Sequence, residues 1–249
     1  MRLVVVTGAS RGLGAALAER FVRRGDEVVA VARDEARLAD LARRLGPACR
    51  PLSADLSTGD GRAALLDAAP SCDVAVLNAG VGLHGPLAGQ PWEAVRSMVD
   101  LNVGSVIHLA HHYVGAMRRR GAGRVLMVAS SVAERGAPQL AAYAASKAFV
   151  LTLGRGLAAE LHGSGVTVSC LVPGPLATEF AARAGMPARL VARGDDVGTV
   201  ATAALDGLER GEPVIVPGVR RRIERRLKSA LPEPVWAALA RRHHSGGEP

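Results

Sequence analysis

The residues best suited to chemistry are a tyrosine and a lysine four positions apart, in the stretch Tyr143-Ala144-Ala145-Ser146-Lys147. On a helix, this spacing places both side chains on one face. A free tyrosine has a pKa of about 10, which is too high for easy proton exchange at neutral pH. A neighbouring ammonium group stabilises the phenolate and lowers that pKa. Tyr143 and Lys147 are therefore a candidate proton donor and its partner. The same spacing also occurs by chance in many helices, so the pair alone does not indicate catalysis.

A glycine-rich turn near the start of the chain is the second chemical feature. It reads Thr7-Gly8-Ala9-Ser10-Arg11-Gly12-Leu13-Gly14, and it lies between an apolar run and a predicted helix. Such a tight turn requires residues without Cβ, and the helix N-terminus offers unpaired N–H groups to a pyrophosphate. The spacing differs from the familiar G-x-G-x-x-G pattern. The turn indicates a dinucleotide site, and the alternative is a plain strand-to-helix connection.

The end of the second predicted strand bears on the identity of the dinucleotide. An acidic residue there holds the ribose 2′-hydroxyl of NAD, whereas an arginine accommodates the 2′-phosphate of NADP. The strand ends at Arg33, and Arg11 in the glycine turn could flank the same phosphate through a bidentate contact. The pattern favours NADPH. Asp34 follows directly and keeps NADH open, and both arginines could instead be solvated surface residues.

These residues need elements that hold them, and the chain alternates short Val-rich runs with longer segments of helical length. Strands are predicted at residues 3–6, 27–31, 50–53, 74–77, 124–129, 167–172 and 214–216. Helices are predicted at 12–24, 35–45, 61–69, 92–120, 143–162 and 197–210. This alternation predicts an α/β fold, a doubly wound, Rossmann-like parallel sheet of about seven strands with helices on both faces.

The segment 173–194 carries glycine and proline but no clear strand. We expect it to form a lid over the substrate. It contributes the apolar side chains Phe180, Met186, Leu190 and Val191, which suggest an apolar ligand.

Composition restricts the class of protein. The chain has 249 residues, 49% of them hydrophobic, and no apolar run near the ~18 residues of a membrane span. The N-terminus lacks the pattern of a signal peptide. Cys49, Cys72 and Cys170 are widely spaced and form no metal-ligand cluster, which favours a reducing cytoplasm and no metal. His108 and His112 share a helix face, but no carboxylate completes a metal site.

The formal charge of +8 is concentrated at the C-terminus, where residues 218–249 hold eight Arg or Lys against three Glu. We expect one catalytic domain at 1–218 and a basic helical extension at 219–249, and no nucleic-acid binding. Val219, Ile223, Leu227 and Leu231 recur every four residues among arginines, which predicts a basic amphipathic helix. It could contact an anionic membrane surface, an acidic carrier protein or a partner subunit. The alternative is a capping helix with a solvated basic face.

The boundaries within this extension can also be predicted. Pro232 and Pro234 would end the basic helix, before a short second helix at 236–240 and a disordered end at 245–249.

Taken together and in order, the motifs resemble the short-chain dehydrogenase/reductase family in its compact form, over residues 1 to about 218. The glycine turn matches the family's TGxxxGxG, Asn78-Ala79-Gly80 matches its NAG motif, and Pro173-Gly174 with Thr178 matches its PG motif. The resemblance implies a catalytic set of Asn102, Ser130, Tyr143 and Lys147. It implies cofactor contacts from Gly8, Ser10, Arg11, Gly12, Leu13, Gly14, Arg33, Asp55, Leu56, Asn78, Ala79, Gly80, Tyr143, Lys147, Pro173, Gly174, Leu176 and Thr178.

Two adjacent serines compete for one family position. The family places its serine thirteen residues before the tyrosine and six after the arginine that opens the strand, which selects Ser130. Ser131 is then a neighbour that could assist. By resemblance, Ser130 orients a substrate carbonyl, Tyr143 donates a proton, Lys147 holds the nicotinamide ribose and Asn102 anchors a water beside Lys147.

The resemblance thus implies an NADPH-dependent reductase of a small, apolar carbonyl compound that works as a homodimer or homotetramer. An NAD-linked alcohol dehydrogenase working in the oxidative direction is one alternative. A non-catalytic NADP-binding regulatory protein is another.

Overall fold

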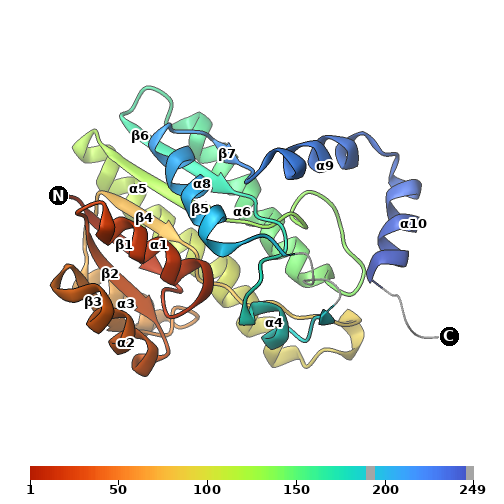
Figure 1. The fold of residues 1–249 in the computed structure, drawn as a ribbon, viewed down its shortest axis with the longest axis horizontal. Coiled ribbons are helices and arrows are strands. Elements are labelled where there is room, and N and C mark those ends of the chain that lie inside the picture. Colours follow the sequence, from red (N-terminus) through yellow and green to blue (C-terminus); the bar gives the residue numbers. More distant parts are fainter. Residues whose placement is uncertain (189–193, 245–249) are drawn as a thin grey trace.

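A seven-stranded parallel sheet forms the centre of the protein (Figure 1). The computed structural model describes residues 1–188 and 194–244. The strand order is β3-β2-β1-β4-β5-β6-β7, which confirms the predicted doubly wound fold. The strands are β1 (Leu3–Thr7), β2 (Glu27–Ala32), β3 (Cys49–Ser53), β4 (Val74–Leu77), β5 (Gly123–Val128), β6 (Val166–Leu171) and β7 (Val214–Ile215).

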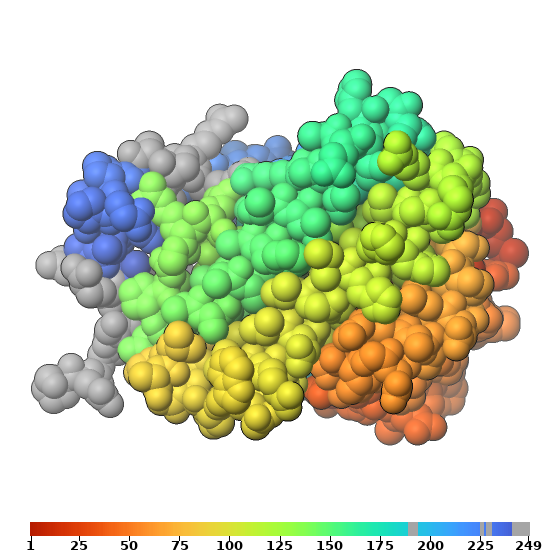
Figure 2. Space-filling view, turned by 180° about the vertical axis from the view of Figure 1, so that it is seen from behind, coloured from red at the N-terminus to blue at the C-terminus, as the bar shows by residue number. Residues whose placement is uncertain are grey.

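Helices cover both faces of this sheet. One face carries α1 (Gly12–Arg23), α2 (Glu35–Leu45) and α8 (Val197–Glu209). The other carries α3 (Gly59–Ala68), α5 (Val106–Arg120) and α6 (Ala141–Glu160), which run side by side across the view in Figure 2. Because both faces are covered, the central strands are continuous apolar runs, and Val4, Val5 and Val6 are fully buried. Two 3-10 turns, η1 (Gly46–Ala48) and η2 (Leu87–Gly89), lie in the connections.

The strand order reverses between β1 and β4, which are neighbours in the sheet. In open α/β sheets, such a reversal leaves a crevice at the carboxyl ends of the strands. The segments that follow β1, β4, β5 and β6 in the chain therefore meet at one edge, and they carry the glycine turn and the NAG, serine and PG motifs.

The segment 92–120 is not the single helix that its periodicity predicts. It consists of α4 (Trp92–Val99), a π-helical stretch η3 (Asp100–Ser105) and α5. A π-helical turn accommodates one extra residue, and such turns are frequent at functional sites. The helical periodicity on each side hides this local shift, so the pattern could not reveal it. The stretch contains Asn102.

The segment 173–194 contains a helix that was not predicted, α7 (Glu179–Arg183). Thr178 caps its N-terminus, because the hydroxyl accepts a hydrogen bond from the backbone N–H of Phe180 at 3.3 Å. An isolated bridge between Leu176 and Asp195 closes the base of the segment. Phe180 and Met186 pack in a small apolar cluster with Tyr143, while Leu190 and Val191 lie outside the described residues.

The C-terminal extension contains two helices, α9 (Val219–Ala230) and α10 (Glu233–His244). The second is longer than predicted, because Pro234 lies in its first turn, where a helix tolerates proline. The predicted disordered end at 245–249 lies outside the described residues.

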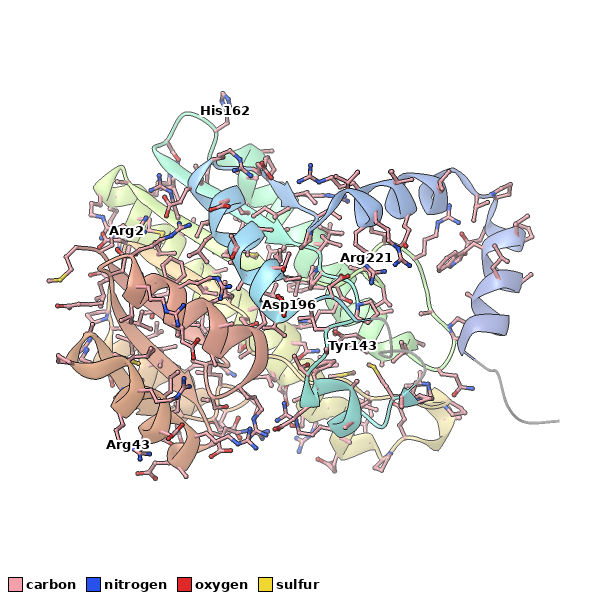
Figure 3. The ribbon with its side chains drawn as sticks, viewed as in Figure 1. Arg2, Arg43, Tyr143, His162, Asp196 and Arg221 are labelled. Carbon is pink, nitrogen blue, oxygen red and sulfur yellow. The ribbon has the colours of Figure 1, made fainter. Side chains whose placement is uncertain are left out.

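The orientation of α9 differs from that of a capping helix with its apolar side inward. Val219, Ile223 and Leu227 are 69%, 54% and 65% exposed. Arg221 instead faces the rest of the protein (Figure 3), and its guanidinium pairs with Asp195 and Glu224 at 3.0 Å each. The pair with Asp195 therefore attaches α9 to the rest of the protein, whereas Glu224 belongs to the helix itself, and the apolar row points outward.

Candidate active site

A cleft of about 1210 Å³ lies at the carboxyl edge of the sheet. Its lining includes Ser130 and all eighteen residues predicted to contact the cofactor, from Gly8 in the first turn to Thr178 beside α7. The structure thus brings together residues from seven separate segments of the chain. Asn102 is the exception among the predicted site residues, because it is completely buried behind the cleft.

The glycine turn presents bare backbone to this cleft. Gly8 and Gly12 have positive φ angles, +68° and +54°, which favour glycine. A Cβ on Gly14 would lie 2.1 Å from the carbonyl oxygen of Gly8, so no side chain fits there. The turn leads into the N-terminus of α1, where a pyrophosphate would find free N–H groups and a partial positive charge. The site therefore fits a dinucleotide.

Thr7 and Asn78 join the turn to the end of β4. The Thr7 hydroxyl accepts hydrogen bonds from the backbone N–H groups of Asn78 and Ala79 at 2.9 and 3.0 Å, and donates one to the carbonyl of Val76. The Asn78 amide donates to the Thr7 carbonyl at 2.9 Å. These bonds fix the glycine turn against the NAG segment. Thr7 is fully engaged in this role, which the sequence analysis did not assign.

Several arginines surround the end of the cleft next to β2. Arg33 is exposed and lies 3.6 Å from Asp55. Arg11 pairs with both Asp34 and Glu179. Asp34 also accepts a hydrogen bond from the backbone N–H of Arg37 at 3.1 Å and so caps α2. Both oxygens of the Asp34 carboxylate are therefore engaged by the protein itself.

Sequence reasoning missed Arg37 and Glu179 in this group. Arg37 lies in the first turn of α2, three residues after its cap Asp34, and its place so close to the end of β2 was a usable signal. Glu179 comes from a distant segment, and only the fold brings it to Arg11 and Arg37.

Tyr143 extends from α6 into the cleft and is only 7% exposed. Its ring centroid lies 5.8 Å from that of Phe180. Burial raises the pKa of Tyr143 to about 12, and a hydrogen bond with Ser130 acts in the opposite direction. The expectation of a lowered pKa is therefore wrong for this structure, because desolvation of the phenolate exceeds the stabilising contact. Tyr143 is a protonated phenol over the whole neutral range.

The structure distinguishes Ser130 from Ser131. Ser130 is half-buried and interacts with Tyr143, whereas Ser131 is exposed and its backbone N–H donates to the Pro173 carbonyl at 2.8 Å. Both line the cleft. Of the two serines, Ser130 is the one that interacts with the phenol, which agrees with the choice made from the family's spacing.

Lys147 lies one helical turn beyond Tyr143 and is 4% exposed. Its ammonium group donates a hydrogen bond to the backbone carbonyl of Val128 at 2.9 Å. Burial lowers its pKa to about 8. The ammonium is therefore mostly charged at pH 7 and loses its proton within a mildly alkaline range.

The side chain of Asn102 is fully engaged in the protein interior. Its carbonyl oxygen accepts from the backbone N–H of Val81 at 3.0 Å. Its amide donates to the Val81 carbonyl at 2.9 Å and to the Ser146 hydroxyl at 3.0 Å. The Asn102 oxygen and the Lys147 nitrogen both lie beside Gly80. Asn102 thus links η3, α6 and the NAG segment, which is a positioning role.

No group of three or more metal-ligating side chains gathers within the described ranges 1–188 and 194–244. His108 accepts from Arg62 at 3.1 Å, and the ring nitrogen Nε2 of His112 lies 2.7 Å from the Pro70 carbonyl. Over the same part of the chain, no helix has the length and apolar character to cross a membrane.

Comparison with known proteins agrees with this geometry. The family model described as short chain dehydrogenase matches residues 2–187. An uncharacterized oxidoreductase of Myxococcus xanthus is 34% identical over 248 residues, covering 97% of each chain. A short-chain dehydrogenase from Sphingobium yanoikuyae, solved in complex with NADPH, has 32% identity and a TM-score of 0.83, covering 94% of this chain and 97% of that one.

A second solved structure is the bulky-bulky ketone specific alcohol dehydrogenase of Comamonas testosteroni. It has 30% identity and a TM-score of 0.77, covering 94% of this chain and 96% of that one. The family model matches about three quarters of this chain, so the chain belongs to the short-chain dehydrogenase/reductase family of oxidoreductases.

Proposed function

We propose that the protein is an NADPH-dependent reductase that converts the carbonyl group of a ketone or aldehyde into an alcohol. One observation carries this proposal most directly. A buried, protonated tyrosine faces the same cleft as a backbone groove shaped for a dinucleotide. A proton donor beside a bound hydride source is what carbonyl reduction requires.

The arginines at the end of β2 support NADPH over NADH. Arg11, Arg33 and Arg37 all line the cleft there. Asp34, the residue that could hold a ribose 2′-hydroxyl, already caps α2 and pairs with Arg11. The relative from Sphingobium yanoikuyae, which was solved with NADPH, supports the same choice.

The roles of the residues follow from their positions. When bound, NADPH supplies the hydride. Tyr143 donates its phenolic proton to the oxygen that becomes negative, and Ser130 donates a hydrogen bond to the same oxygen. Lys147, whose ammonium donates to the Val128 carbonyl, would hold the nicotinamide ribose. Asn102 keeps Lys147 and the NAG segment in place. Phe180, packed on Tyr143, helps to exclude water.

The proposed cofactor supports the reductive direction. An NAD-linked dehydrogenase would need an acidic residue free to hold the ribose 2′-hydroxyl. Asp34 is already engaged by Arg11 and by the start of α2, so an NAD-linked dehydrogenase working oxidatively is the weaker candidate. A non-catalytic NADP-binding protein would have no use for a buried acid in contact with Ser130.

The substrate is proposed to be an apolar ketone. Met98, Leu140, Phe180 and Met186 form one apolar cluster with Tyr143. The Comamonas testosteroni relative is named for bulky ketones, which agrees with this cluster.

The test is NADPH consumption over a chemically diverse carbonyl panel with Tyr143→Phe as the matched variant. We expect the substitution to lower turnover at least about 100-fold, because it removes the general acid, and to leave the Kd for NADPH within a few-fold. A variant that keeps most of its rate would contradict the assignment of Tyr143. Tight NADPH binding without turnover of any carbonyl would favour the regulatory alternative.

We also propose a homo-oligomer in the cytoplasm. Trp92, Val99 and Ile107, on α4 and α5, are exposed large apolar side chains that a partner subunit would cover. Light scattering after gel filtration tests this: a dimer or tetramer is expected, and a monomer at micromolar concentration would contradict it. The three buried free cysteines are consistent with a reducing compartment.

A further inference from the structure

The arginines beside β2 already hold an anion that belongs to the protein. Glu179 accepts a hydrogen bond from Arg11 at 3.0 Å with one carboxylate oxygen and from Arg37 at 3.2 Å with the other. The same contacts lower the pKa of Glu179, and the hydrogen bond from Arg37 contributes most. The Glu179 carboxylate is therefore charged at neutral pH. A carboxylate that bridges two guanidinium groups resembles a phosphate in the sign of its charge and in bidentate geometry.

This bridge is weak enough to be replaced. The side chain of Glu179 is 56% exposed and that of Arg37 is 45% exposed, so water screens their attraction. The surroundings remain rich in positive charge. Arg183 lines the same cleft, and burial together with repulsion from Arg11 lowers its pKa. A phosphate dianion would therefore compete successfully with a single carboxylate.

Glu179 is also the first residue of α7, and this places the bridge next to the substrate end of the cleft. The following residue, Phe180, packs on the ring of Tyr143 and against Gly82, where a Cβ would lie 3.0 Å from the Phe180 ring. One short helix thus connects the arginines beside β2 with the apolar cluster around the proton donor.

We propose that Glu179 occupies the anion subsite that Arg11 and Arg37 offer to the 2′-phosphate of NADP(H), and that the bound phosphate replaces it and releases the start of α7. This inference rests on the proposed NADPH dependence. Glu179 then limits the affinity for NADPH without affecting NADH, and it couples occupation of the phosphate subsite to the segment that covers the substrate.

The first experiment measures Kd for NADPH and for NADH by fluorescence titration of the full chain and of Glu179→Gln. The substitution removes the competing charge and keeps the side-chain shape. We expect NADPH to bind about three- to tenfold more tightly and NADH to change less than twofold. The matched control is Glu35→Gln, which removes an equal charge at the start of α2 outside the cleft lining. It should change neither constant more than twofold.

The second experiment follows α7 itself. Hydrogen exchange of residues 179–186 is measured with and without 2′,5′-ADP, which carries the 2′-phosphate but no nicotinamide. The control nucleotide is 5′-AMP, which lacks only the 2′-phosphate. We expect 2′,5′-ADP to speed exchange of this segment in the unmodified chain and 5′-AMP to leave it unchanged. In Glu179→Gln, exchange should be fast at the outset and insensitive to either nucleotide.

The outcomes separate the two proposals. If the unmodified chain binds NADPH no better than NADH, the proposed cofactor is wrong. If NADPH is preferred but Glu179→Gln binds it equally or more weakly, or α7 does not respond to 2′,5′-ADP, Glu179 is not a competitor and this inference fails alone. A gain shared by Glu35→Gln would also overturn it, since the effect would then be general charge.

Discussion

Replacing Lys147 with methionine should stabilise the fold while it disables the enzyme. The ammonium group is buried, and its pKa falls from 10.5 to about 8. This difference corresponds to about 3 kcal/mol of unfavourable free energy for keeping the charge in the folded protein at pH 7. Methionine has a similar length and carries no charge, so the variant avoids this cost.

One contact is lost in exchange. The hydrogen bond from Lys147 to the Val128 carbonyl disappears, at a cost of about 1 kcal/mol. We therefore expect a net gain of about 2 kcal/mol at pH 7, which is roughly 4–8 °C in Tm for a chain of this size. The same sample should reduce substrate at least about 100-fold more slowly, as expected where function requires a strained site.

The gain should depend on pH with a defined sign. Above pH 8, the folded chain loses the Lys147 proton while the unfolded chain keeps it until about pH 10.5, so the unmodified protein gains stability relative to the variant. The Tm difference should therefore shrink between pH 8 and pH 10 and vanish or reverse by about pH 10.5.

The assay is thermal unfolding of both chains at pH 7 and pH 10, without cofactor and at equal protein concentration. Lys147→Arg is the control, because its guanidinium stays charged throughout and should be destabilising at both pH values. A Lys147→Met protein that melts below the unmodified chain at pH 7, or a difference that is the same at both pH values, would refute the reasoning.

Three further predictions follow from the geometry. The kcat/KM for carbonyl reduction should fall as pH rises through about 8, because Lys147 loses its charge there; a flat profile to pH 10 would contradict this. In α6, Gly154→Ala should lower the free energy of unfolding by about 1–3 kcal/mol, since its Cβ would lie 2.1 Å from the Cys170 sulfur. Gly156→Ala, whose Cβ would meet nothing within 4 Å, should raise it by about 0.5–1 kcal/mol. Urea unfolding measures both, and equal effects would exclude the packing explanation. Arg221→Ala should weaken NADPH binding several-fold in titration, because Arg221 and Asp195 pack against Gly174 of the PG motif. Arg210→Ala is the control and should leave NADPH binding unchanged, because Arg210 is exposed and pairs with Glu212.

Sequence patterns predicted the sheet well because its signals are local. The predicted boundaries of β1, β4 and β6 lie within one residue of those observed. Runs of valine that end at glycine leave little choice of conformation. The choice of Ser130 over Ser131 came instead from the spacing in the family that the motifs resemble, and the interaction of Ser130 with Tyr143 agrees with it.

The remaining features depend on contacts between distant segments. The π-helical stretch around Asn102 preserves helical periodicity on both sides, so the apolar pattern conceals it. The bridge from Glu179 to Arg11 and Arg37 joins residues from three segments. The raised pKa of Tyr143 depends on how deeply the ring is buried, and a spacing of four residues contains no information on depth.

Unlike an ordinary surface helix, α9 presents its apolar side chains to solvent, and this has a practical consequence for handling the protein. Sulfate salts strengthen the association of exposed hydrocarbon, here Val219, Ile223 and Leu227. The Arg221–Asp195 pair that holds the helix is mostly buried, with side chains 17% and 28% exposed, so dissolved salt screens it little. Ammonium sulfate therefore leaves α9 attached and makes its outer row of side chains associate with other molecules. Precipitation at high salt should be avoided in purification.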